Sequence, residues 1–113
     1  MSTPQYEATL RAVGSLDRAT MMLLNTDHPE PRAPGWTPEL SNRLVEGMQA
    51  CRWFLASGFD PPEQFGSWLR KSLEEADLGP GRQSDVYGSM TWQAADAVDR
   101  LREEWRPEWS MYW

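Results

Sequence analysis

The sequence predicts an all-α protein: a compact bundle of four amphipathic helices with an aromatic C-terminal tail over residues 107–113. Apolar residues recur at helical spacing in four segments, and proline or glycine separates each segment from the next. No stretch shows strand-like alternation, an internal repeat or low complexity. We therefore expect residues 1–113 to form a single helical domain. The predicted helices cover about 4–24, 37–57, 60–78 and 84–106.

The first predicted helix begins with a Thr-Pro pair, in which threonine can cap the helix and proline occupies a position where its missing N–H costs nothing. Glu7 and Arg11 form a favourable i,i+4 pair on its exposed side. Gly14 weakens its middle by about 1 kcal/mol relative to alanine. Its apolar face is predicted to comprise Tyr6, Leu10, Val13, Leu16 and Leu23, widened by Ala12 and Ala19.

Residues 25–36 form the long, proline-rich connection, in which three prolines exclude a helix. We interpret it as a stiffened crossover anchored in the core by Trp36. Irregular connections of about twelve residues are often functional, so a functional loop remains the alternative.

The second predicted helix repeats the Thr-Pro start and ends at Ser57-Gly58, where glycine can adopt a positive φ. Cys51 lies on the apolar stripe and is expected to be a small buried hydrophobic residue. The stripe comprises Leu40, Leu44, Met48, Cys51 and Leu55, broadened by Val45 and Phe54.

The third predicted helix follows Asp60-Pro61-Pro62-Glu63, in which Asp60 is the expected cap and Glu63 occupies the capping-box position. A Leu-Gly-Pro-Gly sequence ends it. Its apolar face is predicted to comprise Phe65, Trp68, Leu69, Leu73 and Ala76.

The fourth predicted helix begins near Ser84 or Asp85, and Pro107 ends or kinks it. Alanines make it slim in the middle, so a neighbouring helix can approach closely. Its outer side carries charges of both signs, including Asp96, Asp99 and Arg100, and is expected to be a solvated face. Its stripe comprises Tyr87, Met90, Ala94, Val98, Leu101 and Trp105.

Composition limits the classes of function. The chain has 17 acidic and 11 basic residues, for a net charge of −6, which disfavours direct nucleic-acid binding. A single cysteine excludes an internal disulfide framework and fits a reducing compartment. We find no signal peptide or membrane-spanning stretch and expect a cytoplasmic protein with no membrane partner. The abundance of arginine over lysine suggests a GC-rich bacterial or phage origin.

Residues suited to catalysis, cofactors or metals are sparse. His28, the only histidine, lies in the proline-rich connection without HxxxH or ExxH spacing and is expected to be a surface residue. Cys51 has no sequence-local base. Phosphate-binding glycine motifs are absent, and the acids of the third and fourth helices show only generic spacing for Mg²⁺. We therefore expect no enzyme, no catalytic or metal site and no cofactor.

The acidic end of the third helix departs from local rules. Glu74, Glu75 and Asp77 lie where the helix dipole prefers cations, each at a cost of up to about 1 kcal/mol. Arg70 and Lys71 are expected to pair with Glu74 and Glu75 and to offset part of this cost. The group is either a patch that docks a basic partner or a solvated helix end.

Aromatic residues are in excess, with seven tryptophans in 113 residues. Trp53 and Trp92 fall off the apolar stripes, so each either widens the core or faces outward. In the tail, we expect Trp109 to fold back as a lid and Tyr112 and Trp113 to provide a contact surface.

These features favour a small acidic protein-binding module that acts by occlusion or as an adaptor, of the inhibitor, immunity or phage-countermeasure type. Its partner is expected to be another protein, which the acidic group suggests is basic, or a second copy of the chain. The alternatives are a homo-oligomeric assembly protein and an acidic nucleic-acid mimic. The predicted partner-binding residues are Trp109, Tyr112, Trp113, Glu74, Glu75 and Asp77.

Overall fold

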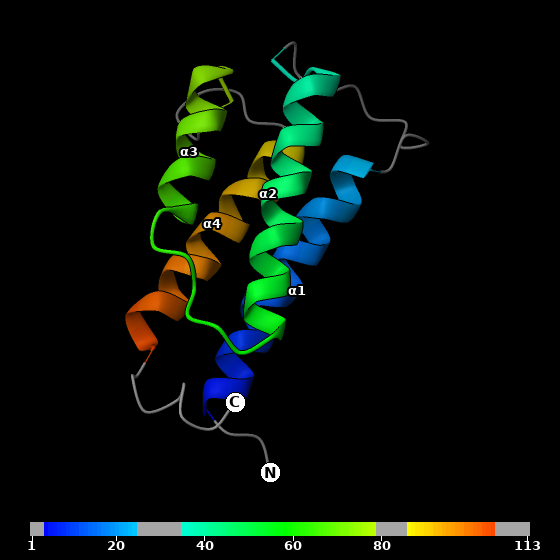
Figure 1. Ribbon diagram of the computed structural model, residues 1–113. Helices are drawn as coiled ribbons and strands as arrows, with labels where there is room; N and C mark the ends of the chain where they lie inside the picture. The colour runs from blue at the N-terminus through cyan, green and yellow to red at the C-terminus, as the bar shows by residue number, and fades with distance from the viewer. Residues whose placement is uncertain (1–3, 25–34, 79–85, 106–113) are drawn as a thin grey trace.

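The computed structural model describes residues 4–24, 35–78 and 86–105, which form four helices in an up-down-up-down bundle (Figure 1). α1 packs against both α2 and α4, while α3 lies mainly on α4 and touches α2 more lightly. The prediction of an all-α four-helix bundle is confirmed. The helices are α1 (Pro4–Leu24), α2 (Pro38–Ala56), α3 (Phe65–Glu75) and α4 (Val86–Glu104).

α1 has the predicted bounds but buries a different face in its first half. Tyr6 and Leu10, predicted to be core residues, are 53% and 50% exposed. The reason is that α1 turns small side chains toward the bundle, which lets α4 approach closely. The buried apolar residues are Ala8, Ala12, Leu16, Ala19 and Leu23.

α2 begins and ends as the sequence indicates. The Thr37 side chain accepts a hydrogen bond from the backbone N–H of Leu40 at 3.1 Å, and Gly58 adopts a φ of 86° just after the helix. All five residues of the predicted stripe are buried, and so is Val45. Phe54, predicted to broaden the core face, is instead exposed.

α3 begins at Phe65, later than predicted, and ends at Glu75. Asp60 and Pro61 each precede a proline, and that neighbour disfavours helical backbone, so the chain becomes helical only after the prolines. The prediction of a capping box formed by Asp60 and Glu63 is therefore wrong. Gln64 occupies the cap position and makes no side-chain cap hydrogen bond.

The core is continuous across all four helices and includes Trp36, which is buried as expected. In α4, Ala94, Val98 and Leu101 are buried, while Trp105 packs against the core at its end. The alanines thus mark the side of α4 that meets its neighbours.

Candidate functional site

Trp53, Phe54 and Phe59 form an aromatic cluster on the surface at the C-terminal end of α2. Their side chains are 63%, 41% and 53% exposed, respectively. The ring centroids of Phe54 and Phe59 are 5.7 Å apart in an edge-to-face arrangement, and those of Trp53 and Phe54 have the same separation and type of geometry. The Trp53 and Phe59 centroids are 6.4 Å apart. Three large apolar side chains therefore pack on one another while remaining open to solvent.

The end of α2 creates this cluster through a Schellman motif. The N–H of Phe59 donates to the carbonyl of Phe54 at 3.0 Å, and the N–H of Gly58 donates to that of Leu55 at 3.1 Å. Gly58 can adopt the required positive φ because it lacks a Cβ. The reversal of the chain brings Phe59 back against Phe54, which is the hydrophobic contact that often accompanies this motif.

An apolar hollow between α2 and α3 adjoins the aromatic cluster and shares Phe54 with it. This α2–α3 hollow has a volume of about 410 Å³. Gly47 lets the Trp68 ring approach α2 closely and line this hollow, because a side chain at position 47 would collide with that ring. The main lining residues are Gly47, Ala50, Phe54, Pro62, Phe65 and Trp68.

Cys51 lies beneath the α2–α3 hollow and is buried, as predicted. Burial raises the pKa of its thiol from 9.0 to about 12, because the thiolate would lose its hydration. At neutral pH the side chain is therefore a protonated, apolar residue rather than a nucleophile.

The predicted acidic group is exposed at the end of α3, as expected of either interpretation. Asp77 adopts a φ of 62°, and its N–H donates to the carbonyl of Glu74 at 3.0 Å. The N–H of Leu78 donates to the carbonyl of Leu73 at 2.8 Å, which completes a second Schellman motif with aspartate in the usual glycine position. Asp77 thus has a structural role in ending α3.

The aromatic cluster and the acidic group lie at opposite ends of the bundle. Because α2 and α3 are antiparallel, the C-terminus of one is distant from the C-terminus of the other (Figure 1). The structure therefore does not place Glu74, Glu75 and Asp77 beside the exposed aromatic residues of α2.

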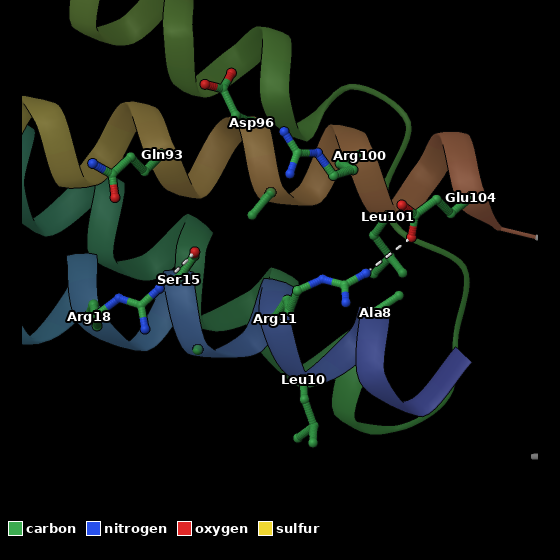
Figure 2. A pocket seen from close by; sticks show the side chains of 12 residues that line it. Ala8, Leu10, Arg11, Ser15, Arg18, Gln93, Asp96, Arg100, Leu101 and Glu104 are labelled. Atoms are coloured by element: carbon green, nitrogen blue, oxygen red, sulfur yellow. Dashed lines mark hydrogen bonds and ion pairs between the residues drawn. The ribbon is translucent and has the colours of Figure 1, made fainter. Parts of the chain in front are cut away.

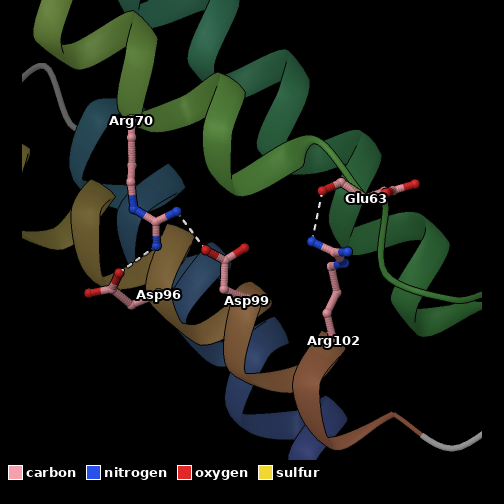
Figure 3. A network of polar contacts seen from close by, with 5 residues as sticks. All are labelled: Glu63, Arg70, Asp96, Asp99 and Arg102. Atoms are coloured by element: carbon pink, nitrogen blue, oxygen red, sulfur yellow. Dashed lines mark hydrogen bonds and ion pairs between the residues drawn. The ribbon is translucent and has the colours of Figure 1, made fainter.

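Arg70 clamps α3 to α4 instead of pairing with Glu74. Its guanidinium donates to Asp99 Oδ2 at 2.5 Å and to Asp96 Oδ1 at 2.6 Å (Figure 3). It also lies 5.9 Å from the centroid of the Trp92 ring. The hydrogen bond with Asp96 raises the pKa of Arg70. The indole N–H of Trp92 donates to the carbonyl of Leu78 at 3.2 Å. This Arg70 clamp is a structural contact between helices, and it corrects the prediction that this side of α4 is only solvated.

Several predicted residues fall outside the described part of the chain. These include the tail residues Trp109, Tyr112 and Trp113, and His28 of the proline-rich connection. Within residues 4–24, 35–78 and 86–105, no group of three or more histidine, cysteine or acidic side chains is arranged to hold a metal ion.

The fold and the surface together define a small helical bundle with an exposed aromatic cluster. Comparison with protein-family models, curated proteins and solved structures finds no match. Among the helices that the structure describes, none has the length and apolarity to cross a membrane.

Sequence reasoning found the aromatic excess but assigned the contact surface to the tail and the acidic group. Trp53 carried the relevant signal, because it lies off the apolar stripe of α2. Phe54 and Phe59 flank the predicted Ser57-Gly58 stop, and a Schellman motif brings these two positions together. A cluster at this place could therefore have been predicted from the stop signal.

Proposed function

We propose that this chain is a non-enzymatic protein-binding module whose aromatic cluster anchors a protein partner. The observation that carries the proposal is the adjacency of three exposed aromatic side chains, Trp53, Phe54 and Phe59. Contiguous apolar surface commonly marks an interaction site, and aromatic residues dominate the energetics of protein interfaces.

The shape of the surface supports an anchoring role. The aromatic cluster projects next to the α2–α3 hollow, so one face offers both protruding rings and a recess of about 410 Å³. A partner would place an apolar side chain in the recess and cover the rings, which removes water from both surfaces. Binding of this kind suits occlusion of a partner's own site, as an inhibitor, immunity protein or phage countermeasure would require, or bridging as an adaptor.

The test compares affinity capture by three immobilised forms of the full chain. The cluster variant carries Trp53→Ser and Phe59→Ser, and the matched control carries Met21→Ser and Leu24→Ser, which removes exposed apolar side chains from α1. We expect the wild-type chain and the control to capture the same partner saturably. The cluster variant should bind it at least about tenfold more weakly, since an interface hot spot contributes 2 kcal/mol or more.

Equal capture by the cluster variant would contradict the proposal, provided that circular dichroism shows native helix content. If instead the control variant loses capture and the cluster variant keeps it, the contact surface lies at the end of α1.

A second copy of the chain is the other candidate partner. A two-fold interface requires a self-complementary surface, and in such an interface the ring cluster of each copy would enter the hollow of the other. Sedimentation velocity separates the two candidates. A dimer that the cluster variant converts to monomers supports self-association, whereas a wild-type monomer at micromolar concentration excludes it.

A further inference from the structure

A second recess, the α1–α4 groove, is lined by residues of α1 and α4 (Figure 2). Its volume is about 430 Å³, which is within the range of small-molecule sites. Gly14 and Ala97 keep the space between the two helices open, and the buried Leu101 lies at its base. Arginine side chains stand on both walls: Arg11 and Arg18 come from α1 and Arg100 comes from α4.

The carboxylates of the groove are already engaged. Glu104 accepts from Arg11 at 3.3 Å, and Asp96 accepts from Arg70 at 2.6 Å. Glu104 lies four residues after Arg100 and Asp96 lies four residues before it. At this spacing, either acid could pair with Arg100 along α4 if it had no other partner. Contacts between helices therefore withdraw both of the carboxylates that could neutralise Arg100 at this spacing.

Two of the three groove arginines have no carboxylate partner among the described residues. Arg100 makes no ion pair there, and Arg18 donates only to the hydroxyl oxygen of Ser15, at 3.2 Å. In a chain of net charge −6, the groove thus keeps uncompensated positive charge.

The three arginines are distributed along the groove rather than at one point. α1 and α4 run antiparallel, and Arg11 meets Glu104 across the groove. Arg100 lies about 6 Å from the level of Glu104 along α4. In the same direction along the groove, Arg18 lies about 10 Å from Arg11 along α1. Arg100 therefore stands on the opposite wall, between the levels of Arg11 and Arg18.

We propose that the α1–α4 groove binds a small organic anion. Its carboxylate or phosphate head lies between Arg18 and Arg100, and its apolar body lies over Ala97 at the base of the groove. Guanidinium groups match the geometry of both kinds of oxyanion and donate two parallel hydrogen bonds to either. The floor of small and aliphatic residues favours an anion with an apolar part over a bare inorganic ion.

The test titrates the isotope-labelled full chain with four probes and follows the backbone amide resonances. Phenyl phosphate and phenylacetate carry the two head groups on similar bodies, benzyl alcohol lacks the charge, and inorganic phosphate lacks the body. We expect one or both organic anions to shift the resonances of residues 14–18 and 97–101 saturably. Benzyl alcohol should not shift them, and inorganic phosphate should bind more weakly than phenyl phosphate. Comparing phenyl phosphate with phenylacetate identifies the preferred head group.

Two variants test the assigned residues. Arg18→Gln with Arg100→Gln should weaken binding by about tenfold or more, because both charge-assisted contacts are lost. Arg43→Gln with Lys71→Gln alters the net charge equally at exposed positions outside the groove and should leave binding nearly unchanged. Gly14→Met keeps every charge, uses a good helix former and fills the groove, so it should abolish binding.

The proposal is overturned if neither organic anion gives saturable shifts at the groove, or if benzyl alcohol binds as well as they do. An equal loss in the charge-matched control pair would likewise overturn it, since net charge rather than the groove would then govern binding. Should the arginine pair variant fail to fold, the Gly14→Met result decides in the same way.

Discussion

Individual side chains in this protein often serve a neighbouring helix rather than their own. Arg70 reaches Asp96 and Asp99 on α4, and Arg11 reaches Glu104, although Glu74 and Glu7 lie at favourable spacing on the same helices. A contact within one helix surface is worth only about 0.2–0.5 kcal/mol. A partly buried arginine between two carboxylates gains more, because surrounding protein reduces the screening by water.

The buried thiol of Cys51 is expected to react slowly. At pH 8, a pKa of about 12 instead of 9.0 lowers the thiolate fraction about a thousandfold. Because the thiolate of higher pKa is intrinsically more nucleophilic, we expect a thiol-reactive disulfide reagent to modify the folded chain at least about thirtyfold more slowly than the chain in denaturant. Absorbance of the released thiol measures this rate directly.

The same pKa sets a dependence of stability on pH. Between about pH 9 and pH 12 the unfolded chain releases the thiol proton while the folded chain retains it, so the free energy of unfolding falls as the pH rises. Cys51→Ala should remove that part of the decline. If denaturant unfolding gives the same slope for both chains above pH 9, the thiol is not protected as described.

At the scale of elements, backbone conformation decides where helices end. α2 and α3 both end in Schellman motifs, but glycine occupies the positive-φ position in α2 and Asp77 occupies it in α3. An L-residue in this conformation costs about 1–2 kcal/mol. The acidic end of α3 thus has a strained residue in addition to charges that oppose the helix dipole.

Asp77→Gly is expected to raise the free energy of unfolding by about 0.5–1 kcal/mol, because the strain is relieved while glycine loses more entropy on folding. Thermal unfolding followed by circular dichroism measures the change. Asp77→Asn isolates the charge, and Gly58→Ala should have the opposite sign by introducing strain at the end of α2. A lower melting temperature for Asp77→Gly would mean that the aspartate side chain stabilises the turn by more than the strain costs.

In the whole bundle, α3 is the shortest helix and makes the fewest contacts with the other helices. It rests mainly on α4, and the Arg70 clamp joins these two helices (Figure 3). A second contact near its start runs from the Arg102 guanidinium to the carbonyl of Glu63 at 2.9 Å. Local opening of α3 is therefore expected to need less free energy than opening of α1, which packs on two helices.

Arg70→Met tests this expectation. The side chain of Arg70 is only 26% exposed, and its loss leaves two carboxylates without their partner. We expect destabilisation of about 1.5–3 kcal/mol and faster hydrogen exchange over 65–75 than over the remaining helices. Arg43→Met, at an exposed position of α2, should change neither quantity appreciably. Uniform acceleration of exchange in all helices would show that α3 does not open separately.

Features that depend on neighbours along the chain could be predicted from the sequence. Periodicity predicted the buried stripe of α2 and the inner side of α4, and the glycine after Ser57 predicted the end of α2. The sequence also shows the paired prolines Pro61 and Pro62. Because a proline disfavours helical backbone in the residue before it, α3 begins later than the expected Asp60 cap. These features are local because hydrogen bonds and backbone sterics act over a few residues.

Contacts between groups on different helices depend instead on how the helices pack. The face that α1 buries depended on how closely α4 could approach its alanines, and the partners of Arg70 depended on the packing of α3 against α4. The sequence likewise allowed Trp53 to be either buried or exposed, and the positions of the other helices leave it exposed. Amphipathic patterns define which residues can be buried, whereas distances between helices determine which of them are covered and which charges remain available for a partner or a ligand.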